Sequence, residues 1–253
     1  MAADMTSDKP TLVLLHGWGM NQGVWHSVVS RFGHKVQVLT PDLPGFGLNQ
    51  QYPKPYDLNA VIASLADNIP ENSYVCGWSL GGLLAIGLAK CFAHKVKQVG
   101  LIAASPCFVA REQWPGMNEQ VLQQFAQALS SNLAQTIERF LAIQAMGSSS
   151  ARDDIKMLRQ AIMAYPAAQP EAVVGALQLL KQDLTAEFSS LTQPVSGIYG
   201  RLDALVPADV VTQLQQLNNN CHMTLVEHAS HAPFISHPDV FNRWLSSWLD
   251  VEL

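Results

Sequence analysis

The chain has 253 residues, of which 48% are hydrophobic and 14% are charged, and its formal net charge is -5. This length suits one large domain with a substantial buried core, and the low charged content excludes a disordered chain. The negative net charge excludes the positive surface potential that nucleic-acid binding requires, so no nucleic-acid partner is expected.

The sequence predicts neither a targeting segment nor a membrane span. Met1–Pro10 carries Asp4, Asp8 and Lys9 without an apolar centre, which is unlike a signal peptide. No run approaches eighteen apolar residues, so no membrane partner is expected. The four cysteines show no CxxC spacing and lie in apolar surroundings, which is typical of buried free thiols in a reducing compartment. We therefore expect a cytoplasmic protein.

Strand and helix patterns alternate along most of the chain. Continuous apolar runs, typical of strands covered on both faces in a parallel sheet, occur at Thr11–His16, Val36–Thr40, Tyr74–Cys76, Val99–Ala103, Val195–Tyr199 and Met223–Val226. Helical patterns occur at Val24–Phe32, Leu58–Ile69, Gly81–Phe92, Ala208–Leu217 and Val240–Leu249. This alternation predicts an α/β fold with a mostly parallel, doubly wound sheet. Ligands of such sheets bind at the carboxyl ends of the strands, where we expect the loops of Gly17, Gly77 and Asp203 to converge.

The alternation stops between Pro106 and Thr192, where amphipathic helical patterns follow one another without a strand. The expected helices are Asn118–Leu129, Asn132–Met146, Ser150–Ala164 and Pro170–Gln182. Asn132 and Ser150 suit N-cap positions, and Pro170 suits a first helical position. The pattern predicts a core of residues 1–106 and 193–253 that is interrupted by a four-helix cap of residues 107–192.

A candidate nucleophile, Ser79, lies in Gly77-Trp78-Ser79-Leu80-Gly81, between an apolar strand and a helix-forming stretch. A serine hydroxyl is a weak nucleophile unless a base can reach it, and a sharp strand-to-helix turn lifts the side chain clear of the sheet. The two glycines remove side chains that would collide across that turn. The pentapeptide alone also occurs by chance in ordinary loops, so the interpretation depends on the strand before it and the helix after it.

A base and a carboxylate follow the last two predicted strands. Asp203 comes after Val195–Tyr199, and His231 comes after Met223–Val226 in a turn held by proline. The resulting chain order of serine, aspartate and histidine is the order of a hydrolase triad on a doubly wound sheet. His228 is the rival base, and Asp183 and Asp209 are the fallback acids. A structural hydrogen-bonding role is expected for His16.

An oxyanion hole needs two N–H donors, and the main chain of Leu80 and Trp18 can supply them. Trp18 follows His16-Gly17 at the end of the first strong strand. We expect the Trp18 indole to line the pocket. For Trp78, a place in the pocket lining and a place in the core are equally expected. No metal site is expected, because His228 and His231 have no third ligand at a zinc-like spacing. No cofactor is expected either.

Taken together, these motifs resemble those of the α/β-hydrolase superfamily over the full chain. They are His16-Gly17-Trp18-Gly19, Asp42–Gly47, Gly77–Gly82, Asp203 and His231. Within the superfamily, the chain is similar to the BioH carboxylesterase family of biotin synthesis, most tellingly in the cap stretch Glu138–Gly147 and in His231–Pro238. One departure is that only about ten residues precede the first strand, where members of the family usually carry extra strands.

That resemblance implies a substrate, the methyl ester of pimeloyl-acyl carrier protein, and therefore an acyl carrier protein as partner. It also implies side activity on small esters. The substrate-binding residues that it implies are Trp18, Leu80, Phe140, Leu141, Ala142, Ile143, Gln144 and His231.

A basic face on the cap suits such a partner. Arg152, Lys156 and Arg159 recur at helical spacing, opposite Ile155, Leu158 and Ile162. Carrier proteins are acidic, so the resemblance favours docking on this face together with Arg139. The alternative is a solvated face that Asp153 and Asp154 partly neutralise.

The sequence thus predicts a monomeric, cytoplasmic serine carboxylesterase with the triad Ser79, Asp203 and His231. A carbon–carbon bond hydrolase or a thioesterase on the same scaffold is the nearest alternative. A ligand-sensing receptor with a hydrolase core is an alternative of another class.

Overall fold

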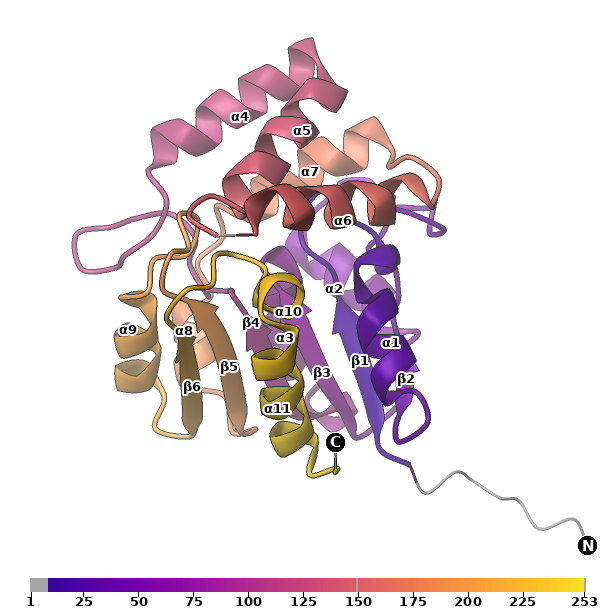
Figure 1. Cartoon of the computed structure of the whole chain (residues 1–253), viewed down its shortest axis with the longest axis vertical. Helices are drawn as coiled ribbons and strands as arrows, with labels where there is room; N and C mark the ends of the chain where they lie inside the picture. Colours follow the sequence, from indigo (N-terminus) through magenta and orange to yellow (C-terminus); the bar gives the residue numbers. More distant parts are fainter. Residues whose placement is uncertain (1–8, 149, 253) are drawn as a thin grey trace, which may run out of the picture.

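The computed structural model describes residues 9–148 and 150–252, and their core is a six-stranded parallel sheet in the order β2-β1-β3-β4-β5-β6 (Figure 1). The strands are β1 Thr11–Leu15, β2 Gln37–Leu39, β3 Ser73–Trp78, β4 Val96–Ile102, β5 Val195–Gly200 and β6 Cys221–Val226. Every pairing between neighbouring strands is parallel. The predicted fold class is confirmed, and β2 forms one edge of the described sheet.

Helices cover both faces of the sheet, which explains why Leu12–Leu15 of β1 and Val99–Ile102 of β4 are apolar at every position. On one side Leu12 and Leu14 join a cluster with Trp25 and Phe241, whereas Val13 points the other way, into the opposite cluster. The first face carries the short helix η1 Gln22–Trp25, α1 His26–Phe32 and α11 Pro238–Leu249. The second carries α2 Leu58–Ala66, α3 Leu80–Cys91 and α9 Val210–Leu217. Successive residues of a strand point to opposite faces, so a strand between two helical layers is apolar at every position.

Each predicted core strand and helix is present, with its ends shifted by a few residues. In the predicted helix Val24–Phe32, a 3-10 turn ends at Trp25 and α1 begins at His26. The structure also contains two short helices that the periodicity did not show, η2 Ala93–Lys95 and α10 Pro233–Ser236. Elements this short carry too few apolar positions for a helical repeat to be recognised.

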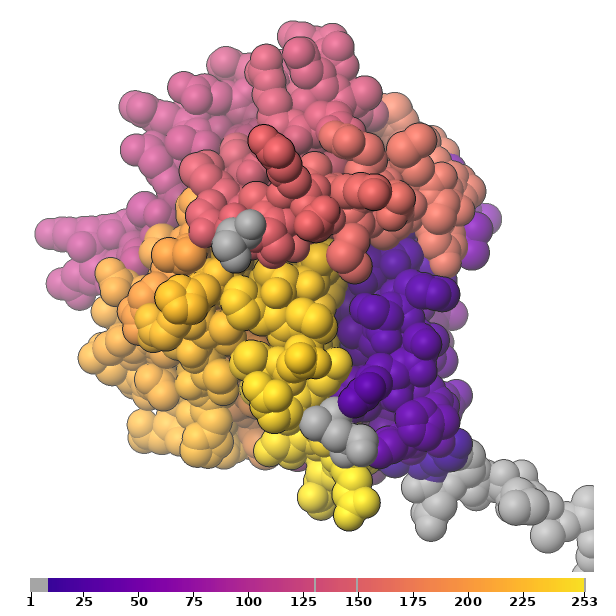
Figure 2. Space-filling view, viewed as in Figure 1, coloured from indigo at the N-terminus to yellow at the C-terminus, as the bar shows by residue number. Residues whose placement is uncertain are grey.

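A helical insertion between β4 and β5 lies over the carboxyl ends of the strands (Figure 1). Its predicted helices are observed as α4 Glu119–Ser131, α5 Leu133–Gln144, α6 Ala151–Met163 and α7 Pro170–Leu179. The short helix α8 Thr185–Ser189 was not predicted. Figure 2 shows the insertion as a layer above the core, with α6 lying against α10 and η1.

The helix starts of the insertion confirm all three predicted positions. The Asn132 side chain accepts from the N–H of Gln135, and Pro170 occupies the first turn of α7. Ser150 occupies the N-cap position of α6 as predicted, but its side chain accepts no hydrogen bond from an N–H of that helix. Its hydroxyl instead contacts Ser148, whose hydroxyl bonds the carboxylate of Asp154. No described helix is long and apolar enough to cross a membrane.

Candidate active site

Ser79 lies at the junction of β3 and α3, in a backbone conformation that non-glycine residues rarely adopt. Its φ is 55° and its ψ is -120°, and its N–H donates to the carbonyl of Ile102 at 2.9 Å. A Cβ on Gly77 would lie 2.1 Å from the carbonyl carbon of Gly81, and one on Gly81 would lie 2.3 Å from the Leu15 carbonyl oxygen. The turn therefore requires both glycines, and its strain is of the kind found at functional sites.

The imidazole of His231 and the carboxylate of Asp203 form a buried hydrogen-bonded pair. Nδ1 of His231 lies 2.7 Å from Oδ2 of Asp203, and both side chains are fully buried. The other carboxylate oxygen, Oδ1, accepts from the N–H groups of Leu205 at 2.8 Å and Val206 at 3.0 Å. These donors orient the carboxylate toward Nδ1, so the imidazole is held with Nε2 free to accept a proton.

Nε2 of His231 is buried and, among the described residues, has no hydrogen-bond partner. A buried ring nitrogen without a partner is unusual, because leaving it unpaired costs free energy. Ser79 itself is only 5% exposed, and the indole ring of the preceding residue, Trp78, lies 5.8 Å from the imidazole ring. The structure thus places the base loop beside the serine turn, while the bond from the Ser79 hydroxyl to Nε2 stays a prediction.

The loops that carry the acid and the base meet because Gly200 ends β5. A Cβ at Gly200 would lie 2.2 Å from the carbonyl oxygen of Ser230 and 2.3 Å from that of Ala229. The N–H of Leu202 donates to Ala229 at 2.9 Å. Only glycine allows this approach, which brings residues 203 and 231 together.

The rival side chains lie elsewhere. His228 and Asp209 are exposed to solvent, and Asp183 forms an ion pair with Arg111. Burial makes desolvation of Asp183 the largest influence on its pKa, but hydrogen bonds from Thr185 and the charge of Arg111 lower that pKa on balance. The described residues hold no cluster of three metal-binding side chains.

The loop after β1 passes directly beside the serine. A Cβ on Gly17 would lie 3.4 Å from Cβ of Ser79, so the main chain leading to Trp18 is adjacent to the nucleophile. Leu80 is the first residue of α3, where backbone N–H groups point toward an anion at the helix start. Trp18 and Leu80 are both fully buried. The main chain of both residues therefore lies beside Ser79, and their role as oxyanion donors stays a prediction.

His16 is a neutral structural residue in this loop. Its Nδ1 donates to the carbonyl of Gly17 at 2.9 Å, and its Nε2 accepts from the N–H of Leu43 at 3.0 Å. Burial lowers the pKa of the imidazole, and the charge of Asp42 only partly opposes that effect. The 3.6 Å approach of Asp42 is therefore not an ion pair, because the ring is uncharged. His16 has the hydrogen-bonding role predicted for it.

Comparison with known proteins agrees with this geometry. Residues 12–244 match the profile of the Alpha/beta hydrolase family. The chain belongs to this family. Proteins named pimeloyl-[acyl-carrier protein] methyl ester esterase from Pseudoalteromonas atlantica and Aeromonas hydrophila are 46% and 45% identical to it. The alignments cover 92% of this chain in both cases, and 91% and 92% of the respective relatives.

Solved structures share the fold of this chain at much lower identity. An esterase from Exiguobacterium antarcticum superposes with a TM-score of 0.86 at 18% identity, over 95% of this chain and 92% of its own. A bromoperoxidase from Bacillus anthracis gives a TM-score of 0.86 at 18% identity, over 96% and 92%. These likenesses concern the fold alone, because two different activities share it.

The cap of this hydrolase is hydrogen-bonded to the loops around Ser79. The N–H of His231 donates to the carbonyl of Gln144 at 3.2 Å, and the Ser230 hydroxyl donates to that of Met146 at 2.8 Å. The Trp18 indole donates to the carbonyl of Val173 in α7 at 2.9 Å. Periodicity and motifs could not show these contacts, because all three acceptors are main-chain atoms.

The substrate segment implied by the family resemblance is divided between two faces of α5. Phe140, Leu141 and Gln144 are buried, and the ring of Phe140 packs edge-on against Trp18 at 4.8 Å. Ala142 is exposed and lines, with Ile143, a surface pocket of about 430 Å³ between α4 and α5. Five consecutive helical residues cannot face one cavity, because successive side chains are 100° apart.

Gln144 carries an unusual buried amide. The residue is 2% exposed, and Oε1 of its side chain has no hydrogen-bond partner among the described residues. An unpaired buried oxygen is available to a ligand that brings its own donor.

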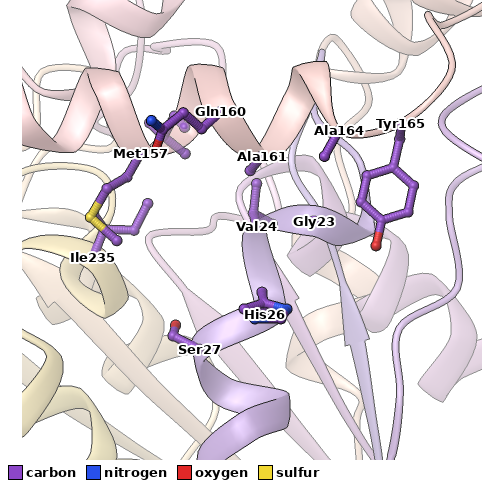
Figure 3. A pocket seen from close by; sticks show the side chains of 11 residues that line it. Gly23, Val24, His26, Ser27, Met157, Gln160, Ala161, Ala164, Tyr165 and Ile235 are labelled. Atoms are coloured by element: carbon purple, nitrogen blue, oxygen red, sulfur yellow. The ribbon is translucent and has the colours of Figure 1, made fainter.

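A second groove, of about 320 Å³, lies between α6 and the η1–α1 segment (Figure 3). Its walls are lined by Val24, His26, Met157, Tyr165 and Ile235, among others, and the figure shows Met157 and Ile235 on the same side of it. None of Ser79, Asp203 and His231 lines this groove, so it is distinct from the candidate active site.

Proposed function

We propose that this chain is a serine carboxylesterase that hydrolyses the methyl ester of pimeloyl-acyl carrier protein to pimeloyl-acyl carrier protein and methanol, in biotin synthesis. The observation that carries this proposal is the name shared by relatives 45–46% identical over 92% of the chain. Alignments of that length include the cap, which covers the side of the sheet where the substrate would enter.

The proposed reaction uses Ser79, His231 and Asp203 as a triad. The Ser79 hydroxyl attacks the methyl ester carbonyl while Nε2 of His231 takes its proton, and Asp203 stabilises the imidazolium through Nδ1. The N–H groups of Leu80 and Trp18 hold the oxyanion. Removing one such donor typically costs about 2.7 to 4 kcal/mol of transition-state stabilisation.

The tetrahedral intermediate then collapses, and methanol leaves with the proton from His231. A water molecule, deprotonated by the same imidazole, attacks the acyl-enzyme and releases the carboxylic acid and free Ser79. No cofactor takes part. The buried unpaired Nε2 supports this role, since its environment lacks a competing partner among the described residues.

The acyl chain is proposed to lie against Trp18, Leu80, Phe140 and Leu141, all of which are buried. Gln144 offers its amide at the end of the same helical face. Ala142 and Ile143 lie at the outer opening of the acyl site in this proposal. Each methylene buried in such a slot contributes at most about 0.8 kcal/mol, so selection for chain length is modest and short esters are side substrates.

The carrier protein is proposed to dock on the basic face formed by Arg139, Arg152, Lys156 and Arg159. All four side chains are exposed. The carboxylate of Asp154 turns inward to Ser148 at 2.9 Å, which leaves the exposed Asp153 as the acid that partly neutralises this face. Arg159 is engaged by Glu138 on α5, which leaves Arg139, Arg152 and Lys156 as the cations for an acidic partner. Such docking mainly raises the association rate and weakens with salt.

A comparison of carrier-bound and free methyl pimelate tests both parts of the proposal. We expect a higher kcat/KM for the carrier-bound ester at low salt, which falls toward that of the free ester at high salt. Arg152→Glu combined with Lys156→Glu should abolish this preference without changing turnover of the free ester. Arg243→Glu, an exposed cation of α11, is the matched control and should leave it intact. An unchanged preference in the double variant would rule out this docking face.

The competing activities make different products. A thioesterase would release free acid from a carrier-bound thioester, and a carbon–carbon bond hydrolase would cleave a diketone, so matched substrates distinguish them from the esterase. A receptor would show no repeated turnover of a nitrophenyl ester. The names of the relatives support the esterase over these alternatives.

The remaining parts of the proposal concern the organisation of the protein. We propose a core of residues 1–106 and 193–253 with a cap of residues 107–192, acting as a monomer in the cytoplasm. The buried free thiols of Cys76, Cys107 and Cys221 support a reducing compartment. Sedimentation of the purified protein tests the oligomeric state.

A further inference from the structure

Trp78 connects the turn that carries the nucleophile to the loop that carries the base. Its main chain ends β3 immediately before Ser79, and its indole N–H donates to the carbonyl oxygen of His231 at 2.8 Å. The two residues are 153 positions apart in the chain, and both are fully buried. One side chain therefore connects the turn of the proposed proton donor, Ser79, with the loop of the proposed acceptor, His231.

Packing holds the indole in this position. Its ring lies edge-on to Phe234 at 4.9 Å and tilted against the imidazole of His231 at 5.8 Å. Phe234 in turn packs against Trp25 and against Phe241 of α11. Large aromatic side chains locked by neighbours on several sides have little rotational freedom, so the indole acts as a rigid spacer.

The hydrogen bonds to His231 come from three directions. Asp203 fixes Nδ1, Gln144 accepts from the main-chain N–H, and Trp78 donates to the main-chain oxygen. The first sets the rotation of the imidazole ring, and the other two set where the main chain of residue 231 lies. Of these, only the bond from Trp78 starts from the residue adjacent to the nucleophile.

We propose that Trp78 is a positioning residue, whose indole N–H sets the separation between the Ser79 hydroxyl and Nε2 of His231. This inference rests on the proposed role of His231 as the base, and it does not depend on which ester is the physiological substrate. The indole itself does not touch the reacting atoms in this role. It acts through the main chain of His231.

Loss of the indole N–H should lower turnover without weakening substrate binding. The buried carbonyl of His231 would lose its donor, and the base loop would shift to recover one. A displacement of about 1 Å at a reacting group can cost about 100-fold in rate, so we expect kcat to fall roughly 10- to 100-fold. KM for a small ester should not change, because the N–H makes no contact with the acyl group in this scheme.

The sharpest test replaces Trp78 with 3-benzothienylalanine by amber suppression, since this isostere keeps the bicyclic ring and lacks the N–H. Trp78→Phe provides a second variant that also keeps an aromatic ring. The measurements are kcat and KM for p-nitrophenyl acetate and the rate of Ser79 labelling by a fluorophosphonate, both normalised to titrated active sites. Thermal unfolding checks that each variant is folded.

Trp244 offers a matched control, because its indole N–H also makes one hydrogen bond, to the Ser196 hydroxyl at 3.0 Å. The same two replacements at Trp244 should leave kcat and the labelling rate unchanged. A folded Trp78 variant with kcat and labelling within about two-fold of the wild type would overturn the inference, because a displaced base costs far more. A fall in activity that disappears once kcat and the labelling rate are normalised to titrated active sites would also overturn it.

Failure of the proposed function gives a different pattern of results. If Ser79→Ala still hydrolyses the ester, the serine mechanism is wrong whatever the Trp78 variants do. If Ser79→Ala is inactive and the benzothienylalanine variant matches the wild type, only the role of Trp78 is rejected.

Discussion

The indole nitrogen of Trp18 donates to the main-chain oxygen of Val173 at 2.9 Å, so the loop after β1 is hydrogen-bonded to helix α7 of the cap. The same indole packs edge-on against Phe140 of α5. Trp18 therefore contacts two cap helices while its main-chain N–H lies in the loop beside Ser79. In this hydrolase the cap does more than cover the site, because it also fixes one of the proposed oxyanion donors.

Trp18→Phe tests this relationship. The replacement removes the bond to Val173 and keeps the main-chain N–H, so we expect a loss of about 1 kcal/mol in the free energy of unfolding and a lower kcat. Trp114→Phe is the control, because its indole donates to the carbonyl of Cys107 at 2.8 Å, on a loop that carries none of the proposed catalytic residues. A similar loss of stability with unchanged kcat is expected there. Equal kcat in both variants would show that the hydrogen bond from the Trp18 indole to Val173 does not position the main-chain N–H of Trp18.

Asp203→Asn tests the acid of the triad. The amide nitrogen can donate where the carboxylate accepted, which favours the wrong imidazole tautomer, so we expect kcat to fall about 10⁴-fold. Asp209→Asn changes an exposed aspartate six residues later in the chain and should leave kcat unchanged. The measurement is steady-state hydrolysis of p-nitrophenyl acetate with folding checked by circular dichroism. Near-wild-type turnover of Asp203→Asn would assign the acid to another residue.

His16 predicts a dependence of stability on pH. Burial lowers its pKa in the folded state below the usual value near 6.5, so the unfolded chain binds the proton more readily. The stability that neutral His16 provides is fully present above pH 6.5 or so and is lost as the pH falls below it. Protonation would also break the bond that Nε2 accepts from Leu43.

The pH effect can be isolated by comparing the wild type with His16→Asn. The difference between their free energies of unfolding, measured with urea at several pH values, should be largest at pH 8 and should shrink toward pH 5. Other histidines contribute equally to both proteins and cancel. A difference that grows as the pH falls would mean that the folded state favours the charged imidazole.

Most of what positions the site could be predicted from the sequence, for identifiable reasons. Ser79 and Asp203 follow continuous apolar strands, and a parallel sheet brings the carboxyl ends of all its strands to one edge. The segment of α5 was less well predicted. The resemblance treats residues 140–144 as one group, whereas helical geometry turns Ala142 to solvent and Gln144 into the interior. Contacts to main-chain carbonyls, such as that of Trp78 to His231, leave no pattern in a single sequence.

Gly200→Ala tests whether the approach of the acid and base loops limits catalysis. The added Cβ would lie 2.2 Å from the carbonyl oxygen of Ser230, and backbone cannot yield as a flexible side chain can, so the loop of His231 must move. We expect a stability loss of about 1 to 3 kcal/mol from overpacking. A shift near 1 Å at the base should also lower kcat by up to about 100-fold.

Gly87→Ala separates these two effects. Its Cβ would lie 2.2 Å from Cδ1 of Ile62, so this variant is also overpacked, but at the contact between α3 and α2. We expect a smaller change in melting temperature than in Gly200→Ala, because the end of the Ile62 side chain can move and alanine is the better helix former. The kcat per folded molecule should be unchanged, because the contact does not involve the loop of His231. If Gly200→Ala loses stability and keeps full turnover, the approach of the two loops serves folding and does not set the catalytic geometry.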